Sequence, residues 1–260
     1  MTEIDVPAFL ATLTELMVEA GRQVLDVYEQ SDCHIVTKED GSPQTLADRR
    51  AEEILLAGLR RLTPAIPVIA EESYEAGPAS VRELFWLVDP LDGTREFIDR
   101  NGQFTINAAL IHRGQPILGA VHAPALDTLY TGALGHGAFV RRFDDRRPLQ
   151  CRICPEEGIT VVGSRSHNDP TAMQGFLANY CVKQFLAAGS SLKFCMVAEG
   201  SADLYPRLGR TMEWDTAAGH AVLLAAGGEV LTLDHQPLAY GKSGHENPHF
   251  YARATRREIA

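Results

Sequence analysis

Two carboxylates, Asp89 and Asp92, follow directly on an apolar run and could do chemistry together. Residues 85–88, Phe-Trp-Leu-Val, favour a buried strand. Pro90 fixes the backbone φ angle between the two carboxylates and donates no backbone hydrogen bond, and Gly93 permits a tight turn. We expect a short helix to begin at Thr94. Oxygen ligands at a strand end, beside a helix N-terminus, favour a place for divalent cations next to a place for phosphate.

The same stretch also has a simpler interpretation. An isolated Asp-Pro-x-Asp-Gly is typical of a turn in which the aspartates cap backbone N–H groups. Two further acidic ends favour the metal site. Glu71-Glu72 follows the apolar run 66–70, and Trp214-Asp215 opens a helix-like stretch that ends at Gly227-Gly228. Three acidic strand or helix ends in one chain indicate a shared metal cluster, and the residues alone leave the turn as the alternative.

Regular elements must position these carboxylates. Apolar spacing predicts a helix near residues 6–28 and a second helix from Thr45, where Thr45 and Asp48 have capping-box spacing. Short apolar runs between residues 104 and 140 predict an antiparallel meander, and strands then alternate with helices to residue 251. We therefore predict an α/β protein with an α+β N-terminal half, residues 1–147, and an α/β C-terminal half, residues 148–260. The expected surface joint is residues 144–147.

The composition excludes some classes of function. The chain has 260 residues, 45% of them hydrophobic, and a formal net charge of −10. A general nucleic-acid binder needs a basic footprint, so we expect no nucleic-acid partner. Local cations or a metal could still receive a small phosphorylated ligand.

The cysteines and the N-terminus bear on the compartment. Five cysteines, an odd number, fit a reducing environment. Cys151 and Cys154 form a lone C-x-x-C, which we interpret as two reduced cysteines in a strand rather than a redox or zinc site. The sequence has no apolar stretch of membrane-spanning length, and its acidic start lacks the basic residues of a signal peptide. We expect a cytoplasmic protein.

Two longer motifs resemble a known family. Residues 89–94, Asp-Pro-Leu-Asp-Gly-Thr, and residues 214–219, Trp-Asp-Thr-Ala-Ala-Gly, match the signatures of the inositol monophosphatase superfamily, which are lithium-sensitive, magnesium-dependent phosphatases. The resemblance covers nearly the whole chain. It implies the sugar-phosphatase fold, layered α-β-α-β-α, with the site between the two halves. It also implies two or three Mg²⁺ ions and hydrolysis of a phosphate monoester.

The resemblance implies a role for particular residues. One metal, which activates water, would be held in part by the carbonyl of Leu91 and by Thr94, and Asp89 would bridge to a second metal. Asp48 would bond to Thr94 and help to remove the water's proton, while Gly93 and Thr94 would receive phosphate oxygens. Lys38 would lie in a loop over the site. On sequence alone, Asp48 is equally a helix cap and Lys38 a solvated surface lysine. The implied metal ligands are Glu71, Asp89, Leu91, Asp92 and Asp215.

Substrate choice must come from the second half. Taken singly, its polar residues are more often surface or capping groups, but as a set they supply hydroxyls and cations for a second phosphate. Residues 192–195, Leu-Lys-Phe-Cys, and 204–207, Leu-Tyr-Pro-Arg, resemble the bacterial 3′(2′),5′-bisphosphate nucleotidases, whereas residues 241–249 depart from that pattern. The candidate substrate contacts are Ser164, His167, Ser190, Lys193 and Arg207.

The resemblance therefore implies a phosphorylated nucleotide as substrate. The implied reaction converts 3′-phosphoadenosine 5′-phosphate to AMP and phosphate and would serve sulfate assimilation. The alternatives are an inositol monophosphatase or fructose-1,6-bisphosphatase activity, or a regulatory binding protein on the same scaffold. The sequence leaves open the oligomeric state and a peripheral association with the cytoplasmic face of the inner membrane.

Overall fold

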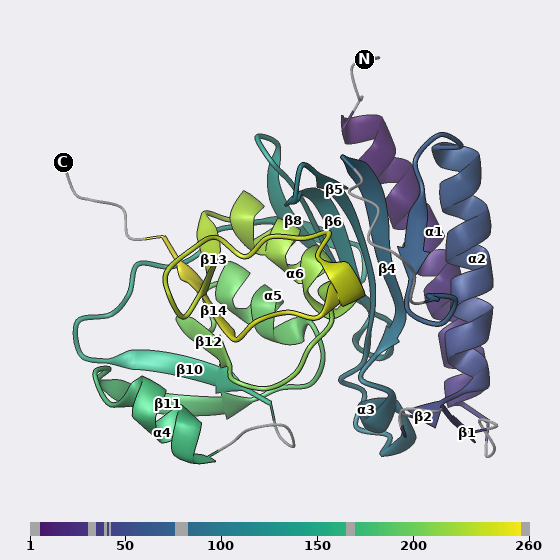
Figure 1. Cartoon of the computed structure of the whole chain (residues 1–260). Helices are drawn as coiled ribbons and strands as arrows, with labels where there is room; N and C mark the ends of the chain where they lie inside the picture. Colours follow the sequence, from purple (N-terminus) through teal and green to yellow (C-terminus); the bar gives the residue numbers. More distant parts are fainter. Residues whose placement is uncertain are drawn as a thin grey trace.

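Helices and sheets alternate in five layers in the computed structural model (Figure 1). The structure describes residues 6–30, 35–38, 41, 43–75, 83–164 and 170–255. The helices are α1 (Val6–Tyr28), α2 (Leu46–Leu62), α3 (Thr94–Ile98), α4 (Pro170–Leu177), α5 (Leu192–Ala198) and α6 (Glu213–Ala225), with single 3₁₀ turns η1 (Pro124–Leu126) and η2 (Ser243–His245).

The strands form three sheets. A small ribbon joins β1 (Val36–Thr37) and β2 (Pro43–Gln44). The seven-stranded sheet runs in chain order through β3 (Val68–Ala70), β4 (Leu84–Asp92), β5 (Thr105–His112), β6 (Gln115–Ala123), β7 (Thr128–Ala133), β8 (Gly137–Arg142) and β9 (Asp145–Leu149). The five-stranded sheet has the order β11 (Val182–Ala187), β10 (Ile159–Gly163), β12 (Leu204–Arg207), β14 (Phe250–Ala254), β13 (Gly228–Thr232).

Helices α1 and α2 cover one face of the seven-stranded sheet, and α5 and α6 lie between the two larger sheets (Figure 1). Because both faces of β4 are covered, its first five residues, 84–88, are continuously apolar rather than alternating. Trp86 and Val88 pack toward α1 and α2, whereas Phe85 and Leu87 pack toward α5 and α6. This layering confirms the expected α-β-α-β-α arrangement.

A bulge at the end of β4 aligns the two aspartates. Three positions apart on a regular strand, Asp89 and Asp92 would point to opposite faces. Instead, Asp89 pairs with Asn107 and Asp92 with Thr105 on β5, so β4 contains one residue more than its partner. Since Asn107 and Thr105 are two positions apart and share a face, Asp89 and Asp92 share it too.

The start of α2 confirms the predicted capping box. The hydroxyl of Thr45 accepts a hydrogen bond from the N–H of Ala47, and Asp48 Oδ2 accepts one from the Thr45 N–H at 2.7 Å. This reciprocal bonding fixes the direction in which α2 begins.

The predicted surface joint, residues 144–147, lies in a hairpin of the seven-stranded sheet. These residues turn from β8 into β9, which continues the seven-stranded sheet to Leu149, because Arg147 pairs with Val140. The connection to the second sheet is the irregular stretch 150–158, and Cys151 and Cys154 lie there instead of in a strand. The division into halves at residues 147 and 148 stays a prediction.

Candidate active site

Three elements bring carboxylates together at one end of the seven-stranded sheet. Glu71 follows β3, Asp89 lies in β4 and Asp215 lies in the first turn of α6. One carboxylate oxygen from each lies within 4.8 Å of the others. The N–H of Glu71 bonds to the carbonyl of Val88 at 3.1 Å, so the β3–β4 ladder itself sets Glu71 beside Asp89.

The electrostatics of this cluster suit a divalent cation. Burial raises the pKa of Asp89 well above its usual range, and the charges of Glu71 and Asp92 raise it further. Burial likewise raises the pKa of Asp215, together with the charges of Asp92 and Glu71. Carboxylates this close repel one another when all are ionised. A bound divalent cation would relieve this repulsion. Mg²⁺ fits the site because it prefers oxygen ligands.

Asp92 lies beside this group and links it to the cationic side of the site. Its Oδ2 accepts a hydrogen bond from Asn107 Nδ2 at 3.3 Å. Burial raises the pKa of Asp92, against the attraction of the Lys193 ammonium and the hydrogen bond from Asn107. Asp92 therefore faces both the carboxylate cluster and a buried lysine.

A cleft of about 440 Å³ connects the carboxylates to the second sheet. It lies where α3, α5 and α6 begin and where β12 ends. Most of the residues predicted from the sequence line it. They are Glu71, Asp89, Leu91, Asp92, Gly93, Thr94, Ser164, Ser190, Lys193, Arg207 and Asp215.

Gly93 and Thr94 form the turn from β4 into α3. Gly93 has φ of 90°, in the left-handed region that glycine tolerates best. A Cβ there would lie 3.2 Å from Glu96 Oε2. The hydroxyl of Thr94 donates to the carbonyl of Leu91 at 3.4 Å, which keeps both groups at the cleft.

The structure places Asp48 differently from the expectation. Its Oδ2 accepts hydrogen bonds from the N–H and the hydroxyl of Thr45, at 2.7 and 2.6 Å. Asp48 and Thr94, both among the described residues, form no direct hydrogen bond with each other. Burial raises the pKa of Asp48 to about 7, despite the hydrogen bonds from Thr45 that lower it.

Lys38 belongs to the site rather than to the open surface. Its Nζ lies 2.8 Å from Glu71 Oε1 and 2.7 Å from Glu72 Oε1. Burial alone would lower the pKa of Lys38, but the ion pairs with Glu71 and Glu72 outweigh it and raise the pKa. Gln44 in β2 also donates to Glu72. The β1–β2 ribbon is thereby tied to the segment that carries Glu71.

The opposite wall of the cleft carries cations and unpartnered polar atoms. In the described part of the chain, Ser190 Oγ and Arg207 Nε are buried and have no hydrogen-bond partner. Lys193 Nζ donates to the carbonyl of Ser190 at 2.6 Å. Burial lowers the pKa of Lys193 to about 8, although the charge of Asp92 opposes this shift. His167 and its neighbours 165–169 lie outside the described residues.

Sequence reasoning missed Asn107, Ser191 and Glu213. Ser191 Oγ donates to the carbonyl of Asp215 at 2.6 Å, and Glu213 holds a segment from near the C-terminus. Only Asn107 could have been predicted from the sequence, since a polar side chain within an apolar strand needs a hydrogen-bond partner on a neighbouring strand. The other two depend on contacts between distant segments.

None of the described helices combines the length and the apolar character that crossing a membrane requires.

Known proteins of similar sequence all point to one family. Residues 5–258 match the inositol monophosphatase family. The 3′(2′),5′-bisphosphate nucleotidase CysQ of Escherichia coli is 44% identical over 233 residues, covering 89% of this chain and 93% of that protein. The protein of the same name from Salmonella typhimurium is 45% identical over 235 residues, covering 88% of this chain and 94% of that protein.

Solved structures with a similar fold point to the same family. CysQ from Bacteroides thetaiotaomicron, a bacterial member of the inositol monophosphatase family, has a TM-score of 0.84 at 34% identity, covering 98% of this chain and 100% of that chain. Inositol monophosphatase from Anabaena (Nostoc) sp. has a TM-score of 0.77 at 27% identity, covering 96% of this chain and 91% of that chain. The chain therefore belongs to the inositol monophosphatase family.

Proposed function

We propose that the protein is a metal-dependent 3′(2′),5′-bisphosphate nucleotidase that hydrolyses 3′-phosphoadenosine 5′-phosphate to AMP and phosphate. The observation that carries the proposal is one cleft with two unlike walls. Carboxylates suited to cations form one wall, and the unpartnered Ser190 Oγ and Arg207 Nε lie in the other. The similarity to nucleotidases of this name supports it.

The acidic wall would hold the phosphate that leaves. Glu71, Asp89, the Leu91 carbonyl, Asp92 and Asp215 would hold two or three Mg²⁺ ions. Bound Mg²⁺ supplies an activated water and charge that stabilises the leaving oxygen. The backbone at Gly93 and Thr94 would receive phosphate oxygens, since the first N–H groups of a helix lack partners within it.

Asp48 would accept the proton that the attacking water loses. A general base works best with a pKa near the working pH, and burial brings the pKa of Asp48 to about 7. The bond from Thr94 to Leu91, at 3.4 Å, is long. We propose that the Thr94 hydroxyl turns from this carbonyl toward Asp48 during the reaction.

The cationic wall would hold the phosphate that stays. Arg207 offers a planar group with a free Nε, Lys193 a point charge and Ser190 a hydroxyl. A second phosphate in this place would give Ser190 Oγ and Arg207 Nε a partner and would give Lys193 an opposite charge. Ser164, His167 and Lys38 complete the proposed substrate contacts.

A panel of substrates tests the proposal. Phosphate release is measured with Mg²⁺ on 3′-phosphoadenosine 5′-phosphate, inositol 1-phosphate and fructose 1,6-bisphosphate. We expect the highest kcat/KM on the nucleotide. A higher kcat/KM on either sugar phosphate would overturn the nucleotidase assignment, and no release from any of the three would favour a regulatory binding role.

The proposal includes a cellular setting. Removal of 3′-phosphoadenosine 5′-phosphate would serve sulfate assimilation, with the small nucleotide as partner and no nucleic acid. In the described part of the chain, Cys151, Cys181 and Cys195 are free thiols, which suits the reducing cytoplasm that we propose.

A further inference from the structure

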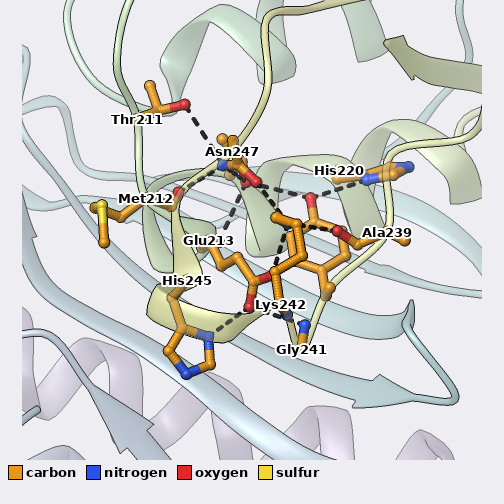
Figure 2. A network of polar contacts seen from close by, with 11 residues as sticks. Thr211, Met212, Glu213, His220, Ala239, Gly241, Lys242, His245 and Asn247 are labelled. Atoms are coloured by element: carbon orange, nitrogen blue, oxygen red, sulfur yellow. Dashed lines mark hydrogen bonds and ion pairs between the residues drawn. The ribbon is translucent and has the colours of Figure 1, made fainter. Parts of the chain in front are cut away.

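Glu213 binds part of residues 241–249, the segment whose sequence departs from the nucleotidase pattern. Its side chain is fully buried, and donors from residues 241–245 surround its carboxylate (Figure 2). The N–H of Gly241 bonds to Oε2 and the N–H of Lys242 to Oε1, each at 2.9 Å. Lys242 Nζ lies 2.6 Å from Oε1, and His245 Nδ1 lies 2.6 Å from Oε2. We call residues 239–247 the clasp.

The clasp holds the start of α6 on both sides of Asp215. Glu213 is the first residue of α6, two positions before Asp215. At the far end of the clasp, Asn247 Nδ2 donates to the carbonyl of Met212 at 2.8 Å and to Thr216 Oγ1 at 3.1 Å (Figure 2). In turn, the N–H of Met212 donates to Asp215 Oδ2 at 2.9 Å. The turn that aims Asp215 into the cleft is thus bonded to the clasp before and after it.

His245 extends this support to the segment that carries Glu71. Its ring meets that of Tyr74 edge-on, with centroids 5.1 Å apart, and lies 5.9 Å from that of Trp214. Tyr74 and Trp214 are themselves 5.4 Å apart. Tyr74 comes three residues after Glu71, and Trp214 immediately precedes Asp215. One histidine of the clasp therefore contacts the segments that carry two carboxylates of the cluster.

We propose that the clasp sets the distance between Glu71 and Asp215, and that His245 and Tyr74 are positioning residues for the metal site. The inference rests on the proposed metal-dependent function. It assigns no contact with substrate to the clasp. Residues that orient metal ligands without touching the metal typically change metal affinity by about tenfold to a hundredfold when they are altered.

Two variants and a matched control test this role. His245 has φ of 56° and His235 has φ of 63°, both left-handed, and asparagine tolerates this conformation. His235 Nδ1 bonds to the hydroxyl of Tyr251, away from the carboxylates. His235→Asn is therefore the control for His245→Asn. Tyr74→Leu removes the same ring contact from the other side.

The direct readout is metal binding by the purified full chain. Free Mn²⁺ is measured by electron paramagnetic resonance, and Mg²⁺ is then titrated in competition. We expect the Mg²⁺ Kd to rise about tenfold in His245→Asn and in Tyr74→Leu, and to stay unchanged in His235→Asn. An unchanged Kd in both test variants, with metal bound normally by the unaltered protein, would overturn the clasp's role alone. If the unaltered protein bound neither ion, the proposed metal site would fail first and this inference with it.

Kinetics separate positioning from general damage. If the clasp positions the ligands, kcat of the two variants should return to near the unaltered value at saturating Mg²⁺, while the Mg²⁺ concentration for half-maximal activity rises about tenfold, matching the Kd. A kcat that stays low at every Mg²⁺ concentration would indicate a merely structural effect and overturn the proposal.

Discussion

Asn107 donates a hydrogen bond from Nδ2 to Asp92 Oδ2 over 3.3 Å, from the strand beside the one that carries Asp92. An asparagine at position 92 could still accept this bond through its amide oxygen. Asp92→Asn therefore removes a charge from the site with little change of shape.

We predict that Asp92→Asn folds normally and loses nearly all phosphatase activity. Loss of metal stabilisation in the transition state costs several kcal/mol, and each 1.36 kcal/mol is about tenfold in rate. The measurement is kcat at saturating Mg²⁺, with Tm as the check on folding. Asp99→Asn, at an exposed aspartate just after α3, is the control. Turnover of Asp92→Asn near the unaltered rate would show that the ligand assignment is wrong.

The second prediction concerns substrate selectivity. Arg207→Ala and Lys193→Ala should each lower kcat/KM on 3′-phosphoadenosine 5′-phosphate about tenfold to a hundredfold, since a hydrogen bond to a charged group is worth about 1.5–3 kcal/mol. Neither should change kcat/KM on inositol 1-phosphate, which has no second phosphate. Lys183→Ala, at an exposed lysine of β11, should change neither value. Equal losses on both substrates would contradict the specificity role of this wall.

The third prediction concerns the metal. Exhaustive removal of divalent ions should abolish activity, and added Mg²⁺ should restore it, because the carboxylate cluster needs divalent charge to stabilise the leaving oxygen. Li⁺ at roughly tens of millimolar should inhibit, since one positive charge cannot replace two. Phosphate release is followed against Mg²⁺ at several Li⁺ concentrations. Full activity in excess chelator would rule out the metal mechanism, whereas insensitivity to Li⁺ would contradict only the lithium prediction.

The fourth prediction concerns stability and pH. His122 is buried, and its Nδ1 lies 2.9 Å from the carbonyl of Met17. Burial lowers the pKa of His122 to about 4, whereas the unfolded chain keeps about 6.5. Between these values the unfolded state binds more protons. The contribution of His122 is therefore full above pH 6.5 and is lost as the pH falls toward 4.

Urea unfolding at pH 7.5 and pH 5.0 measures this effect. Between these two values the unaltered protein should lose about 2 kcal/mol through His122, at 1.36 kcal/mol per pH unit below 6.5. His122→Gln should lose that much less. His136→Gln, at an exposed histidine, should show the same pH dependence as the unaltered protein. An unchanged slope in His122→Gln would mean that the pKa of His122 is the same in the folded and unfolded states, and it would contradict the prediction.

Local features of this protein could be predicted from the order of its residues alone. The capping box of Thr45 and Asp48 spans four residues, so its spacing predicted it fully. The apolar run 85–88 predicted the first part of β4, although the strand continues to Asp92, and the predicted start of a short helix at Thr94 is confirmed by α3. The acidic residues at the strand and helix ends predicted oxygen ligands for a metal, because a carboxylate supplies oxygen atoms wherever its side chain lies.

The way in which those acidic ends meet depends on contacts between distant segments. The bulge in β4 exists only relative to β5, and it sets Asp89 and Asp92 on one face. Lys38 pairs with Glu71 because the β1–β2 ribbon packs there, which no local spacing records. The same holds for Glu213 and the clasp, whose partners are about thirty positions apart. Local patterns reach only a few residues along the chain, whereas burial forces distant polar groups to find partners, and only the folded chain shows which partners they find.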